Sequence, residues 1–191
     1  MVKMIILASG SPRRQMFLKE MGFPFQIEKQ EIDESYPEHL KGAEIAIFLA
    51  HKKAIPFQKT ITPQQMVITA DTIVWHQDQC LGKPQNTAHA RSMLNQLSGT
   101  THEVITAVGF LTTTGYETLH EISSVTFKSL LPSEIEAYIA TQAPFDKAGS
   151  YGIQDHFGKM AVKKIKGSYS NIVGLPIEPT KKKIDEILNS K

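Results

Sequence analysis

The sequence predicts an α/β protein built on a curved, mixed β-sheet flanked by helices. Strand-like and helix-like segments alternate through the first half of the chain, and two long β-branched and aromatic segments then follow one another with no helix between them. Continued βαβα alternation would have predicted a doubly wound sheet instead. The length of 191 residues suits a single domain over 1–191 with a substantial core.

A strand followed directly by a helix is expected at the start of the chain. The apolar run over 4–8 is strand-like, and the next segment reads as a helix over 12–21. Ser11 is placed to act as a hydroxyl N-cap, with Pro12 at the first helical position. Gly22 marks the stop, because glycine readily adopts the left-handed conformation just past a last turn.

The next segments continue this alternation. An extended stretch is expected over 23–32, a helix over 43–53 and a compact apolar strand over 66–75. In the extended stretch, alternate residues are apolar, which predicts a half-buried strand. These residues are Phe23, Phe25 and Ile27.

The second half of the chain is richer in strands. Hairpins are expected where turn-forming residues separate β-branched runs, and helices where caps precede apolar periodicity. The expected segments are a hairpin turn over 76–79, a helix from Asn86 or Thr87 to Leu97 stopped by Gly99, hairpin strands over 104–112 and 116–127, a helix over 133–141, a strand starting at 160–162 and turning near Gly167, and a last helix over 180–188.

Composition narrows the class of protein. Hydrophobic residues make up 41% and charged residues 21%, and the net charge of +2 is too small to indicate nucleic-acid or membrane binding by field alone. The single cysteine, Cys80, suits a reducing compartment, and no apolar run approaches the length of a membrane span. We therefore expect a cytoplasmic protein. The histidines are scattered without a Cys/His cluster, which argues against zinc.

Two arginines occupy the first turn of the first expected helix. Arg13 and Arg14 stand at the positive end of the helix dipole, where cations are disfavoured. Free N–H groups at the same helix end form a ready anion site, and guanidinium groups bind phosphate in bidentate fashion. A multiply charged anion would cancel the repulsion. The alternative is that both arginines point into water.

A carboxylate interrupts the most apolar expected strand. Asp71 lies within Ile68–Val74, and burying an unpaired charge there would be costly. It is therefore expected to be paired or to serve a metal ion or general-base chemistry. The alternative is a strand end or bulge where Asp71 reaches solvent.

Other charged and amide groups are weaker signals. Lys83 would return toward Asp71 across the expected hairpin, although a Gly-Lys-Pro turn is commonplace. Lys53 ends an amphipathic helix, where the dipole alone favours a lysine. Glu34 belongs to an acidic segment that either supplies a second carboxylate to a hard cation or is simply solvated. The glycine-rich loop 146–154 can present backbone groups to a base edge. Taken together, these residues suit a nucleotide polyphosphate with a metal.

Five short motifs, in order along the chain, resemble the Maf family of nucleoside triphosphate pyrophosphatases, which is linked to septum formation. Within that family the chain is most similar to the subgroup that acts on dTTP and UTP, because it carries Ala-Asp-Thr and Tyr-Gly-Ile-Gln. The motifs are Ala8-Ser9-Gly10-Ser11-Pro12-Arg13-Arg14, Ala70-Asp71-Thr72-Ile73-Val74, Gly82-Lys83-Pro84, Asp146-Lys147-Ala148-Gly149-Ser150-Tyr151-Gly152-Ile153-Gln154 and Val173-Gly174-Leu175-Pro176.

The resemblance implies an elongated Maf/ITPase-like fold with two lobes and a central cleft, a divalent cation (Mg²⁺ or Mn²⁺) and frequent homodimers. It implies that Asp71 accepts the proton and, with Glu34, holds the metal. It marks Arg13, Thr72 and Gln154 as substrate-selecting. Further active-site groups are implied at Ser9, Ser11, Arg14, Lys53 and Lys83.

Two short segments depart from the family pattern. After Gln154, where glycine is expected, the chain has Asp155 and His156, a pair that could alter the reach of the loop or add a metal-seeking carboxylate. Trp75-His76 also replaces a more aliphatic continuation. Both bear on substrate preference more than on the reaction.

The expected reaction is hydrolysis of the α–β phosphate bond of dTTP, UTP or modified pyrimidine nucleotides, giving the monophosphate and pyrophosphate. The expected role is house-cleaning, with a link to cell-division arrest, and neither a membrane nor a nucleic acid is expected as a partner. The alternative is a non-catalytic nucleotide- or partner-binding regulator of septum formation.

Overall fold

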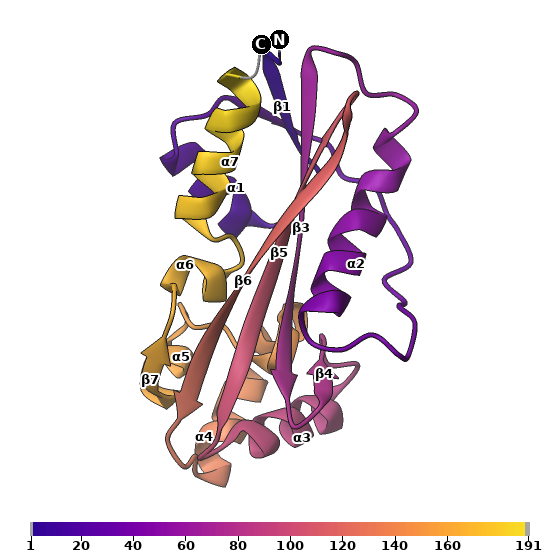
Figure 1. Ribbon diagram of the computed structural model, residues 1–191. Helices are drawn as coiled ribbons and strands as arrows, with labels where there is room; N and C mark the ends of the chain where they lie inside the picture. The colour runs from indigo at the N-terminus through magenta and orange to yellow at the C-terminus, as the bar shows by residue number, and fades with distance from the viewer. Residues whose placement is uncertain (1, 190–191) are drawn as a thin grey trace. The chain divides into compact units, whose positions relative to one another are not determined.

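The computed structural model describes residues 2–189. Within them one mixed sheet has the strand order β2-β1-β3-β5-β6-β7, with β4 paired to β3. This confirms the predicted mixed α/β sheet flanked by helices (Figure 1). The strands are β1 (Met4–Leu7), β2 (Phe25–Ile27), β3 (Gln65–His76), β4 (Gln79–Leu81), β5 (Thr101–Thr112), β6 (Gly115–Phe127) and β7 (Val162–Lys166). The α-helices are α1 (Pro12–Glu20), α2 (Ala43–Ala54), α3 (Thr87–Leu97), α4 (Pro132–Ala140), α5 (His156–Ala161), α6 (Tyr169–Val173) and α7 (Ile177–Asn189).

The chain forms two compact units, each assembled from separate segments. Unit 1 comprises Met1–Asp71, Thr106–Glu121 and Gly174–Lys191, and unit 2 comprises Thr72–Ile105 and Ile122–Val173. The single domain, the elongated outline and the central cleft stay predictions.

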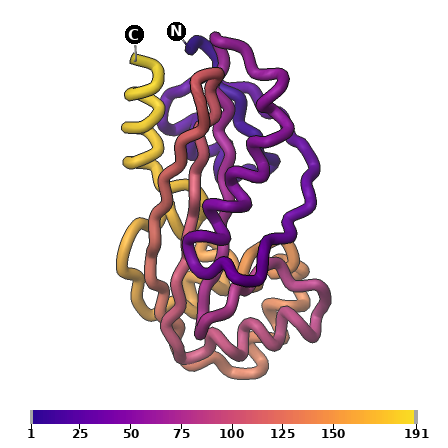
Figure 2. Tube along the Cα trace, turned by 45° about the vertical axis from the view of Figure 1, so that its right-hand side comes forward, coloured from indigo at the N-terminus to yellow at the C-terminus, as the bar shows by residue number. Residues whose placement is uncertain are grey.

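In unit 1, strands lie between α2 on one side and α1 with α7 on the other (Figures 1 and 2). β1 pairs in parallel with both β2 and β3. Each helix buries an apolar face, as its periodicity predicts. The large buried side chains of these faces include Leu18 of α1, Ile45 of α2 and Ile184 of α7, all at most 1% exposed.

The start of α1 differs from the prediction in one detail. Ser11 occupies the N-cap position with extended backbone, but its side chain makes no capping hydrogen bond. The backbone N–H of Ser11 instead donates to the Oγ of Ser9 at 3.3 Å. The hydroxyl that serves this helix end therefore comes from Ser9. Gly22, at φ +83°, confirms the predicted stop.

The extended stretch after α1 is much shorter than expected. Only Phe25–Ile27 forms a strand, at the edge of the sheet, and Ile27 is 52% exposed. The prediction of a half-buried strand over 23–32 is confirmed as a strand only over 25–27, and its half-burial is wrong at Ile27. An edge strand has only one neighbour, and alternation in sequence does not reveal whether a face is covered.

In unit 2, the first hairpin and helix follow their sequence signals. The β3–β4 hairpin turns at Gln77 and Asp78, both with positive φ, and pairs Val74 with Leu81. Asn86 caps α3, because its Oδ1 accepts from the backbone N–H of His89 at 2.9 Å. The predicted turn and helix start are confirmed.

The predicted strand over 160–162 was wrong in its start. Residues up to Ala161 belong to α5, and β7 begins at Val162. Phe157 and Ala161 are both buried and lie four residues apart, the spacing of one helix face. The five-residue helix α6 was not predicted at all.

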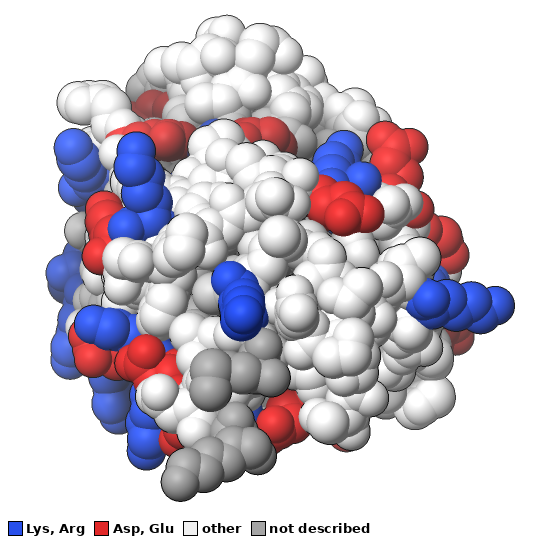
Figure 3. All heavy atoms as spheres, turned by 90° about the horizontal axis from the view of Figure 1, so that it is seen from above, with Lys and Arg blue, Asp and Glu red and all other residues white. Residues whose placement is uncertain are grey.

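Within residues 2–189 no helix combines the length and apolar character that a membrane crossing requires. On the face seen in Figure 3, positive side chains gather along one edge with negative ones interspersed among them, around a mainly uncharged centre.

Candidate active site

Asp71 lies in β3 and is paired, as its burial demands. The residue is only 8% exposed, and Nζ of Lys53 on α2 donates to its Oδ1 at 2.5 Å. The Lys53 side chain is itself only 17% exposed. The alternative that Asp71 merely reaches solvent was wrong, because the packing of α2 against β3 encloses both charges.

The same lysine contacts a second carboxylate. Nζ of Lys53 lies 2.9 Å from Oε1 of Glu34, so a single ammonium group joins two carboxylates from segments far apart in the sequence. The neighbouring lysine contacts both residues that flank Glu34. Nζ of the half-buried Lys52 donates to the backbone oxygen of Ser35 at 2.9 Å and contacts Asp33. The acidic segment is therefore docked on α2.

Burial raises the pKa of the Asp71 carboxyl above its ordinary value. The Lys53 ammonium opposes this by charge and by hydrogen bond, and the Arg14 guanidinium opposes it by charge. The carboxylate of Glu34 adds a smaller upward shift. A raised pKa suits a carboxylate that takes up a proton during a reaction near neutral pH.

Arg14 is directed by two hydrogen bonds. Its Nε donates to the backbone oxygen of Gly174 at 2.9 Å, and its Nη1 donates to the Oγ of Ser9 at 3.2 Å. For Arg14, the alternative of an arginine pointing into water was therefore wrong. Burial lowers the pKa of this guanidinium, the charge of Asp71 opposes the change, and the charge of Arg13 adds to it.

These contacts bring together one part of the predicted site within unit 1. Three cations, Arg13, Arg14 and Lys53, accompany the carboxylates Asp71 and Glu34. The arginines act on one another electrostatically at the start of α1, where the dipole also disfavours them. An anion at this helix end would relieve both effects.

Ser9 and Ser11 also belong to unit 1, whereas Thr72, Lys83 and Gln154 belong to unit 2. Thr72 follows Asp71 along β3. Lys83 lies just past β4, and β4 runs back antiparallel to β3. Gln154 lies in a turn closed by the backbone N–H of Asp155, which donates to the oxygen of Gly152 at 3.1 Å. The approach of Lys83 to Asp71 stays a prediction.

A divalent cation fits the oxygen donors of unit 1. Within the described part of the chain, no group of three or more His, Cys, Asp and Glu side chains is placed to hold a metal. Glu34 and Asp71 do converge on one cation, the Lys53 ammonium. Two carboxylates completed by phosphate oxygens and water form the kind of site that Mg²⁺ takes in nucleotide enzymes.

The alternative of a metal-seeking Asp155 stays a prediction, and its carboxylate has other partners in the structure. Its carboxylate accepts from the hydroxyl of Tyr138 at 2.8 Å and lies 3.5 Å from Nζ of Lys147. Both partners belong to its own unit, as Asp155 does. The carboxylate is thus held by α4 through Tyr138 and by the glycine-rich loop through Lys147.

The family model for Maf-like proteins matches residues 4–187. The chain belongs to the Maf family. This confirms the resemblance carried by the five motifs.

Curated relatives narrow the assignment. A dTTP/UTP pyrophosphatase of Flavobacterium johnsoniae is 51% identical over 90% of this chain and 89% of its own length. A protein of the same name from Christiangramia forsetii is 45% identical over 97% of this chain and 95% of its own length. Another, from Halalkalibacterium halodurans, is 45% identical over 94% of this chain and 93% of its own length. The predicted subgroup is that of these relatives.

A solved structure supports the fold alone. A HAM1 protein from Coxiella burnetii superposes with a TM-score of 0.52 at 12% identity, covering 97% of this chain and all of that one. The fold therefore also occurs in a protein that shares little sequence with this chain.

Three contacts at or near these residues were not predicted from the sequence. The carbonyl of Gly174 accepts from Arg14, 160 positions earlier in the sequence. The hydroxyl that accepts a backbone N–H at the start of α1 is that of Ser9 and not that of Ser11. The Tyr138 hydroxyl accepts from the backbone N–H of Gly152 in the Gln154 turn. The Val173–Pro176 motif was the only sequence signal for Gly174. Nothing local marks Tyr138, since a tyrosine in an amphipathic helix is usually a core residue.

Proposed function

We propose that this protein hydrolyses dTTP and UTP at the α–β phosphate bond, releasing the nucleoside monophosphate and pyrophosphate. The observation that carries the proposal is the buried carboxylate of Asp71, which has a raised pKa, is paired with Lys53 and lies within reach of the charge of Arg14. A protein that only binds nucleotides has no need of a proton acceptor among its phosphate-binding cations. The relatives named dTTP/UTP pyrophosphatase support the same reaction.

Asp71 is the proton acceptor in this proposal. A water oxygen forms a bond to the α-phosphorus while the bond from that phosphorus to the bridging oxygen breaks, and the water proton passes to the Asp71 carboxylate. Arg13, Arg14, Lys53 and Lys83 stabilise the charge that develops on the departing pyrophosphate. Ser9 and Ser11 line the same helix start.

The base is recognised by unit 2 in this proposal. Thr72 and Gln154 offer hydrogen-bond donors and acceptors that match the carbonyls and N–H of thymine or uracil. Arg13 contributes to the same selection. A purine would leave polar groups unpaired, which rejects a wrong ligand more strongly than a lost apolar contact does.

Mg²⁺ or Mn²⁺ is the proposed cofactor, held by Asp71 and Glu34. The ion supplies charge neutralisation at the phosphates when bound. The proposal extends to a homodimer in the cytoplasm, consistent with a single cysteine, and to a house-cleaning role connected to cell-division arrest.

Product analysis in isotopically labelled water tests the reaction. With UTP, Mg²⁺ or Mn²⁺ and H₂¹⁸O, we expect UMP and pyrophosphate, with the ¹⁸O label in UMP. Release of UDP and inorganic phosphate would contradict the α–β assignment, and label in pyrophosphate would contradict attack at the α-phosphorus. Calorimetric binding of UTP with no product after hours would favour the regulatory alternative.

A further inference from the structure

The turn that carries Gln154 is held at its base. The backbone N–H of Asp155 donates to the oxygen of Gly152 at 3.1 Å, which leaves Ile153 and Gln154 as the two central residues. Ile153 is only 7% exposed and anchors one of these positions in the core of unit 2. Gln154 is the more accessible of the two.

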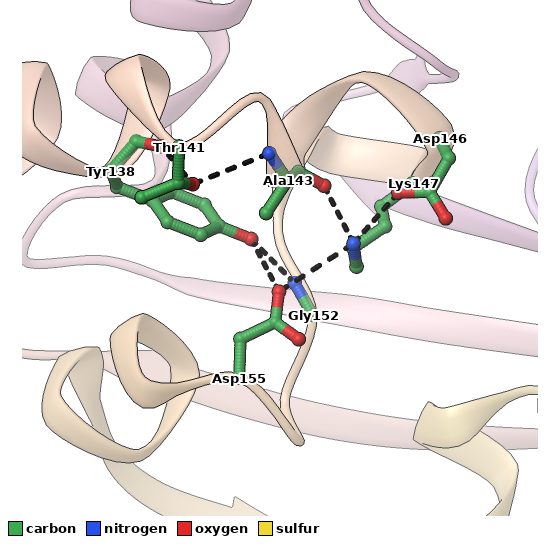
Figure 4. A network of polar contacts seen from close by, with 7 residues as sticks. All are labelled: Tyr138, Thr141, Ala143, Asp146, Lys147, Gly152 and Asp155. Carbon is green, nitrogen blue, oxygen red and sulfur yellow. Dashed lines mark hydrogen bonds and ion pairs between the residues drawn. The ribbon is translucent and has the colours of Figure 1, made fainter.

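The carboxylate of Asp155 connects this turn to two other elements. It accepts from the Tyr138 hydroxyl of α4 at 2.8 Å, and that hydroxyl in turn accepts from the backbone N–H of Gly152 at 3.2 Å. Figure 4 shows the Tyr138 hydroxyl and the Lys147 ammonium both directed toward this carboxylate. The first and last residues of the turn therefore share one hydroxyl group.

Lys147 completes the network from the glycine-rich loop. Its Nζ donates to the backbone oxygen of Ala143 at 2.5 Å and to Asp146 at 2.7 Å, and lies 3.5 Å from Oδ2 of Asp155 (Figure 4). The Lys147 side chain is only 11% exposed. Solvent screens this ion pair less than a surface pair, so Asp155 has a persistent cationic partner.

The tyrosine is well suited to hold a position. Its ring stacks on Phe157 at a centroid distance of 4.1 Å and an angle of 5°, which restrains the ring that carries the hydroxyl. Burial, followed by the nearby Asp155, raises the pKa of the Tyr138 hydroxyl. It therefore remains a donor throughout the neutral pH range.

Two glycines permit this arrangement. A Cβ at Gly152 would lie 2.7 Å from the Asp155 carboxylate oxygen, and a Cβ at Gly158 of α5 would lie 2.2 Å from the backbone oxygen of Gly152. The backbone of the turn thus rests directly on α5, while the side chains of Asp155, Tyr138 and Lys147 hold it from another direction.

We propose that Asp155 is a positioning residue that fixes the Gly152–Asp155 turn and thereby sets Gln154 for recognition of the pyrimidine edge. This inference rests on the proposed function, in which Gln154 reads the base. Asp155 touches no substrate in this role. It acts through the turn, by holding Tyr138 and Lys147 in one hydrogen-bonded network.

Steady-state kinetics of Asp155→Asn with UTP and CTP test this. Uracil has a carbonyl where cytosine has an amino group, so a well-placed amide side chain distinguishes them. We expect KM for UTP to rise about tenfold, as loss of one charge-assisted hydrogen bond predicts, with kcat within about twofold. The preference for UTP over CTP should fall by a similar factor.

Tyr138→Phe provides a second variant that keeps the stack on Phe157. It should change KM and preference in the same direction, and the double variant should lose no more than the larger single loss, because both act through one network. Glu136→Gln is the matched control. Glu136 also lies on α4, and its substitution removes the charge of an exposed ion pair with Arg91. This variant should leave KM for UTP and the preference for UTP over CTP unchanged.

The outcomes separate this inference from the proposed function. If wild type releases pyrophosphate but Asp155→Asn keeps its KM and its preference, the positioning role is overturned. It is equally overturned if kcat falls alike for UTP and CTP with the preference unchanged. If wild type releases no pyrophosphate, the proposed reaction fails, and calorimetric affinities for UTP and CTP in the same variants still decide the role of Asp155.

Discussion

At the scale of single residues, the candidate site of unit 1 contains the buried carboxylate of Asp71, whose neighbouring cations offset only part of the cost of its burial. Asp71 is surrounded by protein, and the cost of removing its charge from water exceeds the help from Lys53 and Arg14, so its pKa is raised. A carboxylate in this state holds a proton more readily than a solvated aspartate. The charges of Lys53 and Arg14 favour its ionised form, which is the form that a proton acceptor requires.

Replacement of Asp71 by asparagine should lower kcat by a factor of about 10² to 10⁴, the usual contribution of a general base. The amide retains the shape of the side chain but cannot take up the water proton. Pyrophosphate release from UTP measures the effect, with Asp185→Asn, an exposed carboxylate on α7, as the matched control. Full activity of Asp71→Asn would remove this residue from the role of base.

The pH dependence follows from the direction of the Asp71 shift. Activity requires the ionised carboxylate, so kcat/KM should fall toward acid through a pKa above the ordinary aspartate value of 3.8. Removal of the nearest cation in Lys53→Met should move this acid limb to still higher pH and lower the maximum rate. A profile of kcat/KM against pH for both proteins is the measurement, and a limb that moves toward acid in the variant would contradict the assignment.

At the scale of elements, short turns place the chemistry. The turn from β1 into α1 supplies Ser9, and the first turn of α1 supplies both arginines. The hairpin from β3 into β4 brings the chain back toward the position of Lys83. The hairpin turn uses Gln77 and Asp78 at φ +47° and +59°, a conformation that most residues adopt at a cost of about 1 kcal/mol or more.

The double substitution Gln77→Asn with Asp78→Gly should therefore stabilise the protein by about 1 kcal/mol, because an Asn-Gly pair adopts this left-handed turn readily. Urea unfolding measures the change. The double substitution Thr113→Asn with Thr114→Gly in the β5–β6 hairpin is the control, since neither of these two described residues has a positive φ. A gain of equal size at the control turn would show that the effect does not come from left-handed backbone.

At the scale of the whole molecule, stability in acid depends on a buried histidine of unit 2. His102 is 2% exposed and shares a hydrogen bond of 2.7 Å with the Tyr151 hydroxyl, while its Nδ1 has no hydrogen-bond partner among residues 2–189. Burial, with a smaller effect of His76, lowers the pKa of His102 to about 3. The folded protein therefore keeps this ring neutral where the unfolded chain protonates it.

The difference between the pKa of His102 in the unfolded chain and in the folded protein determines how stability changes with pH. Below pH 6.5 the unfolded chain binds a proton that the folded protein excludes, so stability falls as pH drops from about 6.5 toward 3. The loss from this group between pH 7 and pH 5 should be about 2 kcal/mol. His102→Gln, which retains a polar side chain without titrating, should show a smaller loss by about that amount in urea unfolding at the two pH values.

The types of the elements were largely predictable because their signals are local. Caps such as Asn86 and stops such as Gly22 and Gly99 act within one turn of their helix, and each was confirmed. The prediction was wrong for the strand after α1 and for the start of β7, where a short element takes its form from its neighbours. Propensity and periodicity say little about segments of three to six residues.

Some of the candidate residues were predictable because their chemistry is not explained by their position, whereas Lys53 and Lys83 gave weaker signals. Two arginines at a helix end that disfavours cations, and an aspartate in an apolar strand, indicate a ligand or an ionic partner. Their mutual contacts were not predictable in the same way. The bond from Arg14 to Gly174 joins positions 160 residues apart, and no local pattern encodes such a distance.

By itself, the sequence determined the class of fold, most helix and strand positions and the Maf family, since these depend on local periodicity and on motif order. Only the tertiary structure decided that Lys53 joins Glu34 to Asp71, that Ser9 serves Arg14 and that Asp155 holds the Gln154 turn. The physical reason is that a buried charge must find its partner in space, and packing alone brings distant segments within hydrogen-bond reach.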